Sequence, residues 1–179
     1  MRHGGRASVG GMWRWVALAV LTAAALVAVL VVRAEAESGT VAHVRDGDTV
    51  ELAGGGVVRL VQIDSPELAQ GECHALEARA ELRRLLPAGS RVRVVEDERL
   101  DRADRFGRRL AYVFRGDQLV NRELVARGAA SVWFFGGRRG RYAGELLAAA
   151  RVARAAGAGL WGACPGTSLD PSAPVESRD

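Results

Sequence analysis

The order of strands and helices in this sequence predicts an α+β domain, a five-stranded Greek-key barrel of the OB type with about three helices. Three observations support this prediction. Short segments alternate apolar and polar residues, a glycine-rich turn joins the first two of them, and a helical segment follows this hairpin. The chain of 179 residues is long enough for one such domain with additional segments.

Strand patterns mark the barrel along the chain. Residues 40–52 alternate in strand fashion, Ala-Gly-Gly-Gly at 53–56 is a turn signal, and residues 57–63 return as a second strand. Further strands are expected at residues 91–97, 109–114 and 129–135.

Helical patterns separate these strands. In residues 74–86, Leu76, Ala80 and Leu85 recur at about one helical turn, and Pro-Ala-Gly follows at the end. A short helix is expected at residues 118–128, where Gly128 provides a C-terminal cap. A long alanine-rich helix is expected at residues 141–156.

Residues 1–36 have the features of a targeting segment. Three arginines precede an uncharged apolar run at residues 15–32, and residues 34–36 fit a small-x-small cleavage site. The run of about 18 residues is longer than a usual signal core and just long enough to span a bilayer. It is therefore either a cleaved signal peptide or an uncleaved membrane anchor. Both place the rest of the chain outside the cell or on the outer face of the cytoplasmic membrane.

Net charge argues little for a nucleic-acid partner. The chain has 25 basic and 21 acidic residues, and residues 1–36 hold four of the arginines and one of the glutamates, which leaves 21 and 20. An argument for nucleic acid must therefore rest on where charges lie.

The rest of the chain is expected to form a domain at residues 40–164 and a polar, disordered tail at 165–179.

The two cysteines, Cys73 and Cys164, allow three interpretations. A disulfide is the default in an exported chain. Free thiols are the second possibility. A metal site would recruit His43 and His74, but the spacing matches no zinc pattern.

Acidic residues meet at the open end of the predicted hairpin. With the turn near Gly55, paired positions sum to about 110, so Asp48 lies opposite Gln62 and Asp46 opposite Asp64. Carboxylates this close need a partner, and a hard cation with oxygen ligands is one. The alternative is that Asp46 belongs to a turn and that these acids are solvated.

Two arginines and one further acid complete the candidate site. Arg59 lies in the middle of an apolar strand, where an arginine is either at a sheet edge or held by an anion. Arg108 follows Gly107, which frees the backbone to present it. Arginine binds phosphate oxygens in bidentate fashion. With Glu67 and a metal site, these are the groups that phosphodiester hydrolysis requires.

Four segments, DGDTVEL, VRLVQIDSPE, DRFGRRLAYVF and QLVNRELVARGAA, resemble the staphylococcal nuclease (thermonuclease) family in order and spacing. The resemblance covers about residues 40–161, and the combination is far more specific than DGDT alone. It implies an OB-type barrel and a monomeric endonuclease that needs Ca²⁺. It also implies hydrolysis of phosphodiester bonds in DNA and RNA, with little sequence specificity and 3′-phosphate products.

The resemblance also implies a role for each matching acidic position. Asp48 and Asp64 would bind Ca²⁺ through their carboxylates. Ser65 stands where the family often has threonine and would bind the ion through its backbone carbonyl. Glu67 matches the proposed general base for the attacking water.

The basic positions match in the same way. Arg59 and Arg108 correspond to the two arginines that grip the phosphate. Arg105 and Phe106 are expected to contact substrate and replace residues that are often lysine and tyrosine in the family. Arg105 keeps the positive charge, whereas Phe106 lacks the hydroxyl.

Several alternatives stay open at this point. The aromatic run at residues 133–135 is either core packing or a stacking surface for bases, and the loop at 136–141 is either a solvated basic loop or a guide for the phosphate backbone. A catalytically silent nucleic-acid- or protein-binding domain and a structural envelope protein are rival functions. Calcium-dependent digestion of denatured DNA would separate these possibilities.

Overall fold

The structure is a computed structural model that describes residues 36–177. The chain divides into two compact units, residues 1–36 and residues 37–179. The predicted signal peptide or membrane anchor lies outside the described residues. Within residues 36–177, no helix is both long and apolar enough to cross a membrane.

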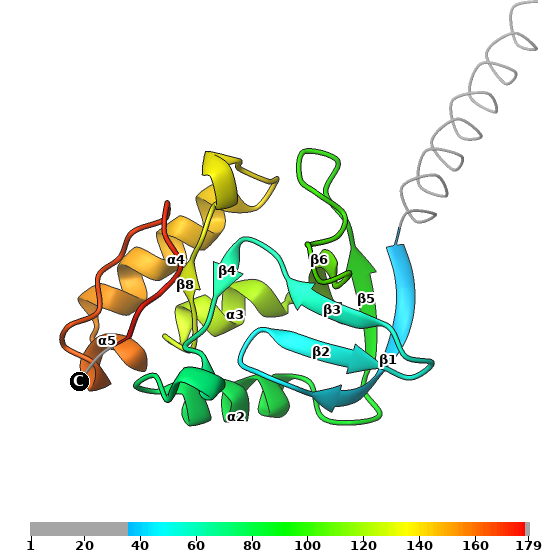
Figure 1. Cartoon of the computed structure of the whole chain (residues 1–179), viewed down its shortest axis with the longest axis horizontal. Coiled ribbons are helices and arrows are strands. Elements are labelled where there is room, and N and C mark those ends of the chain that lie inside the picture. The colour runs from blue at the N-terminus through cyan, green and yellow to red at the C-terminus, as the bar shows by residue number, and fades with distance from the viewer. Residues whose placement is uncertain (1–35, 178–179) are drawn as a thin grey trace, which may run out of the picture. The chain divides into compact units, whose positions relative to one another are not determined.

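A closed five-stranded barrel with an extra strand forms the body of the second unit (Figure 1). The strands are β1 (Ala36–Val44), β2 (Thr49–Leu52), β3 (Val57–Leu60), β5 (Arg91–Val95), β6 (Arg109–Arg115) and β7 (Gln118–Leu119). They follow the order β3-β2-β1-β5-β6-β7, and a parallel pairing of β3 with β6 closes the barrel. The predicted α+β fold of the OB type is confirmed.

The segment 40–52, predicted as one strand, forms two antiparallel strands. β1 pairs with β2, so that Val44 lies opposite Val50. The chain reverses between them, and the Arg45 N–H donates to the carbonyl of Thr49 at 2.9 Å. The prediction of a continuous strand is wrong because alternating polarity also fits two short strands joined by a tight turn.

The register of the β2–β3 hairpin also differs from the predicted one. Thr49 lies opposite Arg59, and the Leu60 N–H donates to the carbonyl of Asp48 at 2.8 Å. Asp48 therefore faces Leu60 rather than Gln62. A glycine-rich turn fixes the presence of a hairpin more firmly than its register.

The second predicted strand, residues 57–63, is interrupted. β3 ends at Leu60, and Gln62 has a φ of 65°, in the left-handed region. The chain then forms β4 (Ile63–Asp64), which pairs with β8 (Ser131–Val132) in a separate two-stranded sheet. The interruption lets one segment serve both sheets, because β3 pairs with β6 while β4 turns toward β8.

Helices pack beside the barrel and complete the core. They are α2 (Ala75–Leu85), α3 (Val120–Ala126), α4 (Ala143–Ala155) and α5 (Leu160–Ala163), with the short 3-10 helices η1 (Leu68–Gln70) and η2 (Phe135–Gly137). α3 contacts β6, α2 and α4, while α4 contacts β8. Helix α2 forms where the sequence predicts a helix, but its buried face contains Ala78, Leu82 and Leu85. Leu76 and Ala80 of the predicted pattern are exposed, so the pattern predicted the helix but not its buried face.

The C-terminal segment, predicted to be disordered, has exposed residues along most of its length but contacts the domain, with Thr167, Val175 and Ser177 buried. Val175 is only 6% exposed, and the carbonyl of Pro171 accepts a hydrogen bond of 2.7 Å from the Phe134 N–H. Cys73 and Cys164 form the expected disulfide, which ties the start of this segment to the domain. Composition alone predicts disorder because it does not register such a covalent tether.

Candidate active site

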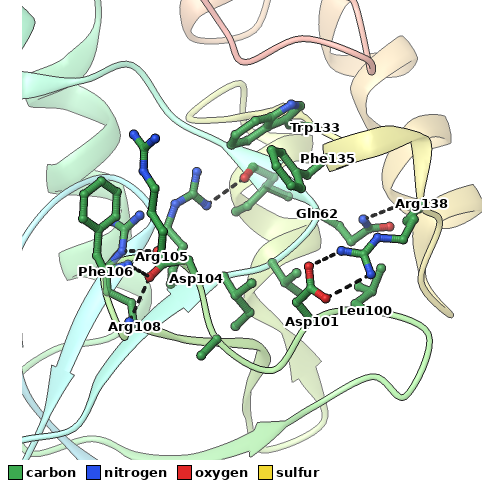
Figure 2. A pocket seen from close by; sticks show the side chains of 15 residues that line it. Gln62, Leu100, Asp101, Asp104, Arg105, Phe106, Arg108, Trp133, Phe135 and Arg138 are labelled. Atoms are coloured by element: carbon green, nitrogen blue, oxygen red, sulfur yellow. Dashed lines mark hydrogen bonds and ion pairs between the residues drawn. The ribbon is translucent and has the colours of Figure 1, made fainter.

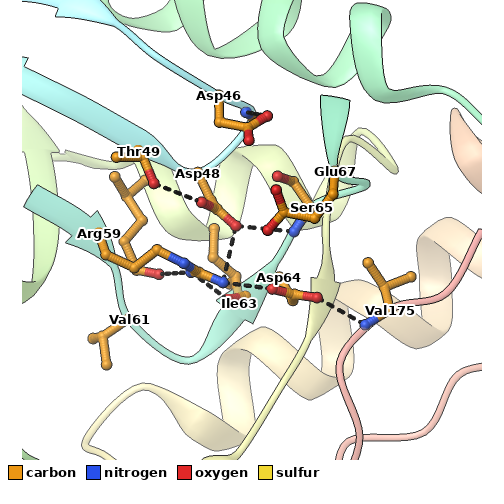
Figure 3. A network of polar contacts seen from close by, with 12 residues as sticks. Asp46, Asp48, Thr49, Arg59, Val61, Ile63, Asp64, Ser65, Glu67 and Val175 are labelled. Carbon is orange, nitrogen blue, oxygen red and sulfur yellow. Dashed lines mark hydrogen bonds and ion pairs between the residues drawn. The ribbon is translucent and has the colours of Figure 1, made fainter. Parts of the chain in front are cut away.

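Arg59 is the centre of a buried polar network at the end of β3 (Figure 3). Its side chain is 8% exposed, and Nη1 donates to the carbonyls of Leu60 and Ile63, each at 2.8 Å. Nη2 lies 2.5 Å from Oδ1 of Asp64 and 3.0 Å from Oδ2 of Asp48. Of the two alternatives expected for this arginine, a sheet edge or a bound anion, the structure shows the second, as a pair of carboxylates that the planar guanidinium contacts together.

Asp48 is held in place from three directions. Besides its contact with Arg59, Oδ1 accepts a hydrogen bond of 2.9 Å from the Thr49 hydroxyl, and Oδ2 accepts one of 3.1 Å from the Ser65 N–H. Gly47 permits this approach, since a Cβ there would lie 2.6 Å from Oγ of Ser65. The DGDT motif thus provides both the Asp48 carboxylate and the space that its contact with Ser65 needs.

Asp64 is the second carboxylate of the network and the last residue of β4. Its Oδ2 accepts a hydrogen bond of 2.8 Å from the backbone N–H of Val175. Burial raises the pKa of Asp64 to about 7, against the lowering effect of the Arg59 guanidinium, and the Asp48 carboxylate raises it further. Below about pH 7 the Asp64 carboxyl group therefore keeps its proton, although an arginine contacts it.

Glu67 lies beside these acids, just after Pro66. Burial raises the pKa of Glu67 to about 7, and the carboxyl group of Asp46 raises it further. Its backbone N–H donates to the Glu72 carboxylate at 2.8 Å. A carboxyl group whose pKa lies near neutral pH can accept a proton efficiently from a reacting water.

A cavity of about 430 Å³ adjoins the network (Figure 2). Cationic and aromatic side chains form much of its wall. They are Arg59, Arg105, Phe106, Arg108, Trp133, Phe135 and Arg138. Because Arg59 belongs both to this wall and to the acidic network, it connects the two parts of the site.

Arg108 is presented by the loop between β5 and β6. Gly107 has a φ of 77°, a conformation that glycine adopts readily, and Nε of Arg108 lies 2.6 Å from Oδ2 of Asp104. The guanidinium groups of Arg105 and Arg108 lie 4.7 and 5.4 Å from the ring centroid of the exposed Phe106. This loop therefore offers two cations and an exposed aromatic face to the cavity.

Gln62 anchors the opposite wall. Its Nε2 donates to the carbonyl of Arg138 at 3.0 Å, and its Oε1 accepts a hydrogen bond of 2.8 Å from the Gly140 N–H. Arg138 in turn pairs with Asp101 across the rim of the cavity (Figure 2). The basic loop at residues 136–141 is thus fixed to the barrel, which the sequence pattern did not indicate.

The aromatic run at residues 133–135 divides between the two expected roles. Phe134 is 2% exposed and belongs to the core. Trp133 and Phe135 line the cavity, with their rings in an edge-to-face contact of 5.5 Å between centroids. Alternation along the chain sends the central ring inward and the outer two toward the cavity.

The structure gathers the predicted site residues into two adjoining groups. The acidic group contains Asp48, Asp64, Ser65 and Glu67, and the cavity wall contains Arg105, Phe106 and Arg108, with Arg59 common to both. Sequence reasoning missed the roles of Thr49, Gln62 and Val175. Thr49 follows Asp48 in the DGDT motif, so the motif could have indicated that its hydroxyl contacts the Asp48 carboxylate. The contact of Val175 depends on tertiary structure alone.

The donor atoms of the acidic group suit a hard cation. Within residues 36–177, no three or more His, Cys, Asp or Glu side chains are grouped as a metal site. Two carboxylates nevertheless meet at one atom, Nη2 of Arg59. Calcium takes six to eight oxygen ligands, which backbone carbonyls and water can complete. Asp48, Asp64 and the Ser65 carbonyl therefore fit such an ion chemically.

Comparison with known proteins agrees with this geometry. The family model described as "Staphylococcal nuclease homologue" matches residues 57–163, more than half of the chain. The chain belongs to the staphylococcal nuclease family. The matched range contains Arg59, Asp64, Glu67 and Arg108, while Asp48 precedes it.

Two relatives illustrate how far the family likeness extends. The chain is 31% identical over 134 residues to an uncharacterized protein of Bacillus anthracis. This alignment covers 71% of this chain and 62% of the relative. It is 32% identical over 105 residues to a thermonuclease of Staphylococcus intermedius. This alignment covers 55% of this chain and 61% of the relative. The chain thus spans about three fifths of the length of each relative.

Proposed function

We propose that this protein is a calcium-dependent endonuclease that hydrolyses phosphodiester bonds of DNA and RNA with little sequence specificity. The position of Arg59 supports this proposal most strongly. Its guanidinium contacts the carboxylates of Asp48 and Asp64, and Arg59 also belongs to the wall of the cavity that Arg108 lines. A phosphate in this cavity would meet two cationic side chains beside a carboxylate pair suited to a hard cation.

In this proposal the acidic group holds the ion. Asp48 and Asp64 bind it through their carboxylates, and Ser65 binds it through its backbone carbonyl. When bound, calcium supplies positive charge that offsets the negative charge of the phosphate. The hydrogen bonds from Thr49 and from the Ser65 N–H keep the Asp48 carboxylate in place for this role.

Glu67 acts as the general base. It orients a water molecule and accepts its proton as the water oxygen bonds to phosphorus. The bond between phosphorus and the 5′ oxygen breaks, the 5′ oxygen takes a proton from solvent, and the other product ends in a 3′-phosphate. Arg108, and Arg59 through its remaining Nε–H, donate to the equatorial oxygens, where negative charge develops. The raised pKa of Glu67 supports its assignment as proton acceptor.

The cavity wall supports the proposed breadth of substrate. Arginines contact phosphates, which every nucleotide carries, and aromatic rings such as Phe106 and Trp133 stack on any base. Duplex stacking competes with such contacts. We therefore expect the enzyme to cleave denatured DNA and RNA faster than duplex DNA.

A digestion assay tests the proposal. Purified protein should cleave denatured DNA in the presence of calcium, and a chelator should abolish cleavage. Glu67→Gln should slow cleavage by about a hundredfold or more, because a general base contributes on that order. The matched control is Glu77→Gln, an exposed glutamate of α2, which should cleave like the wild type. Binding of DNA without cleavage would instead indicate a catalytically silent domain.

We also propose that the domain works outside the cell or on the outer face of the membrane. The basic and apolar pattern of residues 1–36 supports export, and the disulfide between Cys73 and Cys164 suits an oxidising compartment. N-terminal sequencing of the protein from culture medium and from membranes would distinguish a cleaved leader from a retained anchor. Recovery only from the cytoplasm would contradict export.

A further inference from the structure

The segment after Cys164 returns to the acidic group of the site; we call residues 165–177 the C-terminal strap. Cys73 holds both of its ends. The disulfide with Cys164 fixes the start. At the other end the Ser177 hydroxyl donates to the carbonyl of Cys73 at 2.7 Å, and the Cys73 N–H donates to the carbonyl of Ser177 at 3.4 Å. The strap is therefore a closed loop on the domain surface.

The middle of the strap is also fixed. The Phe134 N–H, next to β8, donates to the carbonyl of Pro171 at 2.7 Å. Val175 is 6% exposed and packs with Leu160 and Cys164. These contacts determine where the backbone of Val175 lies relative to β4 and β8.

The strap reaches the candidate metal site at one hydrogen bond. The Val175 N–H donates to Oδ2 of Asp64 at 2.8 Å in a buried position, while Arg59 contacts Oδ1 (Figure 3). The two contacts fix both oxygens of a carboxylate whose terminal torsion otherwise varies broadly. Since each carboxylate oxygen has two lone pairs, accepting one hydrogen bond leaves capacity for a metal ion.

We propose that the C-terminal strap is a positioning element of the metal site, and that Val175 acts through its backbone N–H. This hydrogen bond fixes the rotation of the Asp64 carboxylate so that its remaining lone pairs face the cation. Groups that hydrogen-bond to metal ligands orient them in this way. The inference rests on the proposed function, because it requires that Asp64 binds calcium.

The test compares two substitutions at one position in the full chain. Val175→Pro removes the N–H donor, and Val175→Ala keeps it while removing most of the packing. Calcium titration of chelator-treated protein by calorimetry should give a Kd at least about tenfold higher for Val175→Pro, the scale seen when such partners of metal ligands are lost. Val175→Ala should stay within about twofold of the wild type. Circular dichroism and the metal-free melting temperature identify any variant that fails to fold.

The outcomes separate this inference from the proposed function. A wild type that neither binds calcium nor cleaves DNA would overturn both. A wild type that does both, with equal Kd values for Val175→Pro and wild type, would overturn the strap inference alone. Tighter binding by Val175→Pro would also overturn it, because the strap would then compete with the ion. If Val175→Pro does not fold, a semisynthetic full chain with the Val175 N–H replaced by an ester oxygen lacks the same donor and keeps the side chain, and an unchanged Kd there would overturn the inference.

Discussion

At the scale of single residues, the site is a buried cluster with an excess of negative charge. Buried charges are stable only when they are paired and hydrogen-bonded. Arg59 satisfies two carboxylates and two backbone carbonyls at once, yet one guanidinium cannot neutralise both Asp48 and Asp64. The residual negative charge favours a divalent cation.

Arg108 provides the clearest single-residue test of phosphate binding. Its side chain is 31% exposed, and its ion pair with Asp104 lies within one surface loop. Arg108→Ala should therefore change the free energy of unfolding by less than about 0.5 kcal/mol. It should nevertheless lower kcat by about a hundredfold, as removal of one transition-state donor does. Initial rates on denatured DNA and urea denaturation measure the two effects.

The control for this prediction is Arg102→Ala in the same loop. The Arg102 side chain is 78% exposed and pairs with Glu96 at 3.5 Å. The Arg102→Ala variant should keep both the activity and the stability of the wild type. If Arg102→Ala loses as much activity as Arg108→Ala, then the charge of the loop, rather than a specific contact of Arg108, supports cleavage.

The carboxyl groups of Asp64 and Glu67 give the metal-free protein a distinctive pH dependence. Burial raises their pKa values from 3.8 and 4.5 to about 7. At pH values between the unfolded and folded pKa values, the folded chain keeps protons that the unfolded chain has lost. The free energy of unfolding therefore decreases as pH rises from about 4 to about 7. Calorimetric melting temperatures in chelator should fall across this window. Asp64→Asn should flatten the decrease, whereas Asp117→Asn, an exposed control, should not.

Under the proposed function, calcium should oppose this trend, because it would bind the ionised carboxylates. Its stabilising effect should therefore grow as pH rises through the same window. A melting temperature of the metal-free protein that rises steadily from pH 4 to pH 7 would contradict the burial of both carboxyl groups.

At the scale of elements, sequence periodicity predicted the positions of the longer helices and of most strands. Helix α2 matched the expected 74–86 within a residue at each end. The strands 40–52 and 57–63 were predicted as continuous, because a period of two does not register a turn or a single left-handed residue such as Gln62. The convergence of Asp48 and Asp64 was expected, but the structure reaches it through a different register and the shared contact with Arg59.

Gln62 connects the interruption between β3 and β4 to the wall of the cavity. Gln62→Ala would leave the Gly140 N–H without its buried acceptor, which should cost about 1–3 kcal/mol of stability. The loop at residues 136–141 should also loosen, so KM for a single-stranded oligonucleotide should rise more than kcat falls. Thermal melting and steady-state kinetics measure these changes.

The matched control is Gln118→Ala, an exposed glutamine of β7. It should leave stability and KM unchanged. If Gln62→Ala lowers kcat with KM unchanged, the loop contributes to the chemical step rather than to substrate binding.

At the scale of the whole molecule, the disulfide and the strap join parts of the chain that are distant in sequence. Cys73 and Cys164 are 91 residues apart, and the strap between Cys164 and Ser177 returns to Cys73. Composition could not predict this arrangement, since a polar segment rich in proline and serine has too few apolar residues to fold alone. In the structure it lies against the surface beside the disulfide, where Val175 is buried.

Removing this cross-link should destabilise the domain as a whole. A disulfide that closes a loop of this length restricts the unfolded chain, so Cys73→Ser with Cys164→Ser should lower the free energy of unfolding by about 2–4 kcal/mol. Urea denaturation should show a lower midpoint, and reduced wild-type protein should match the double variant. A change below about 0.5 kcal/mol would mean that packing of Val175 with Leu160 already fixes the strap without the bond. The oxidising compartment proposed for this protein would then contribute nothing to its stability.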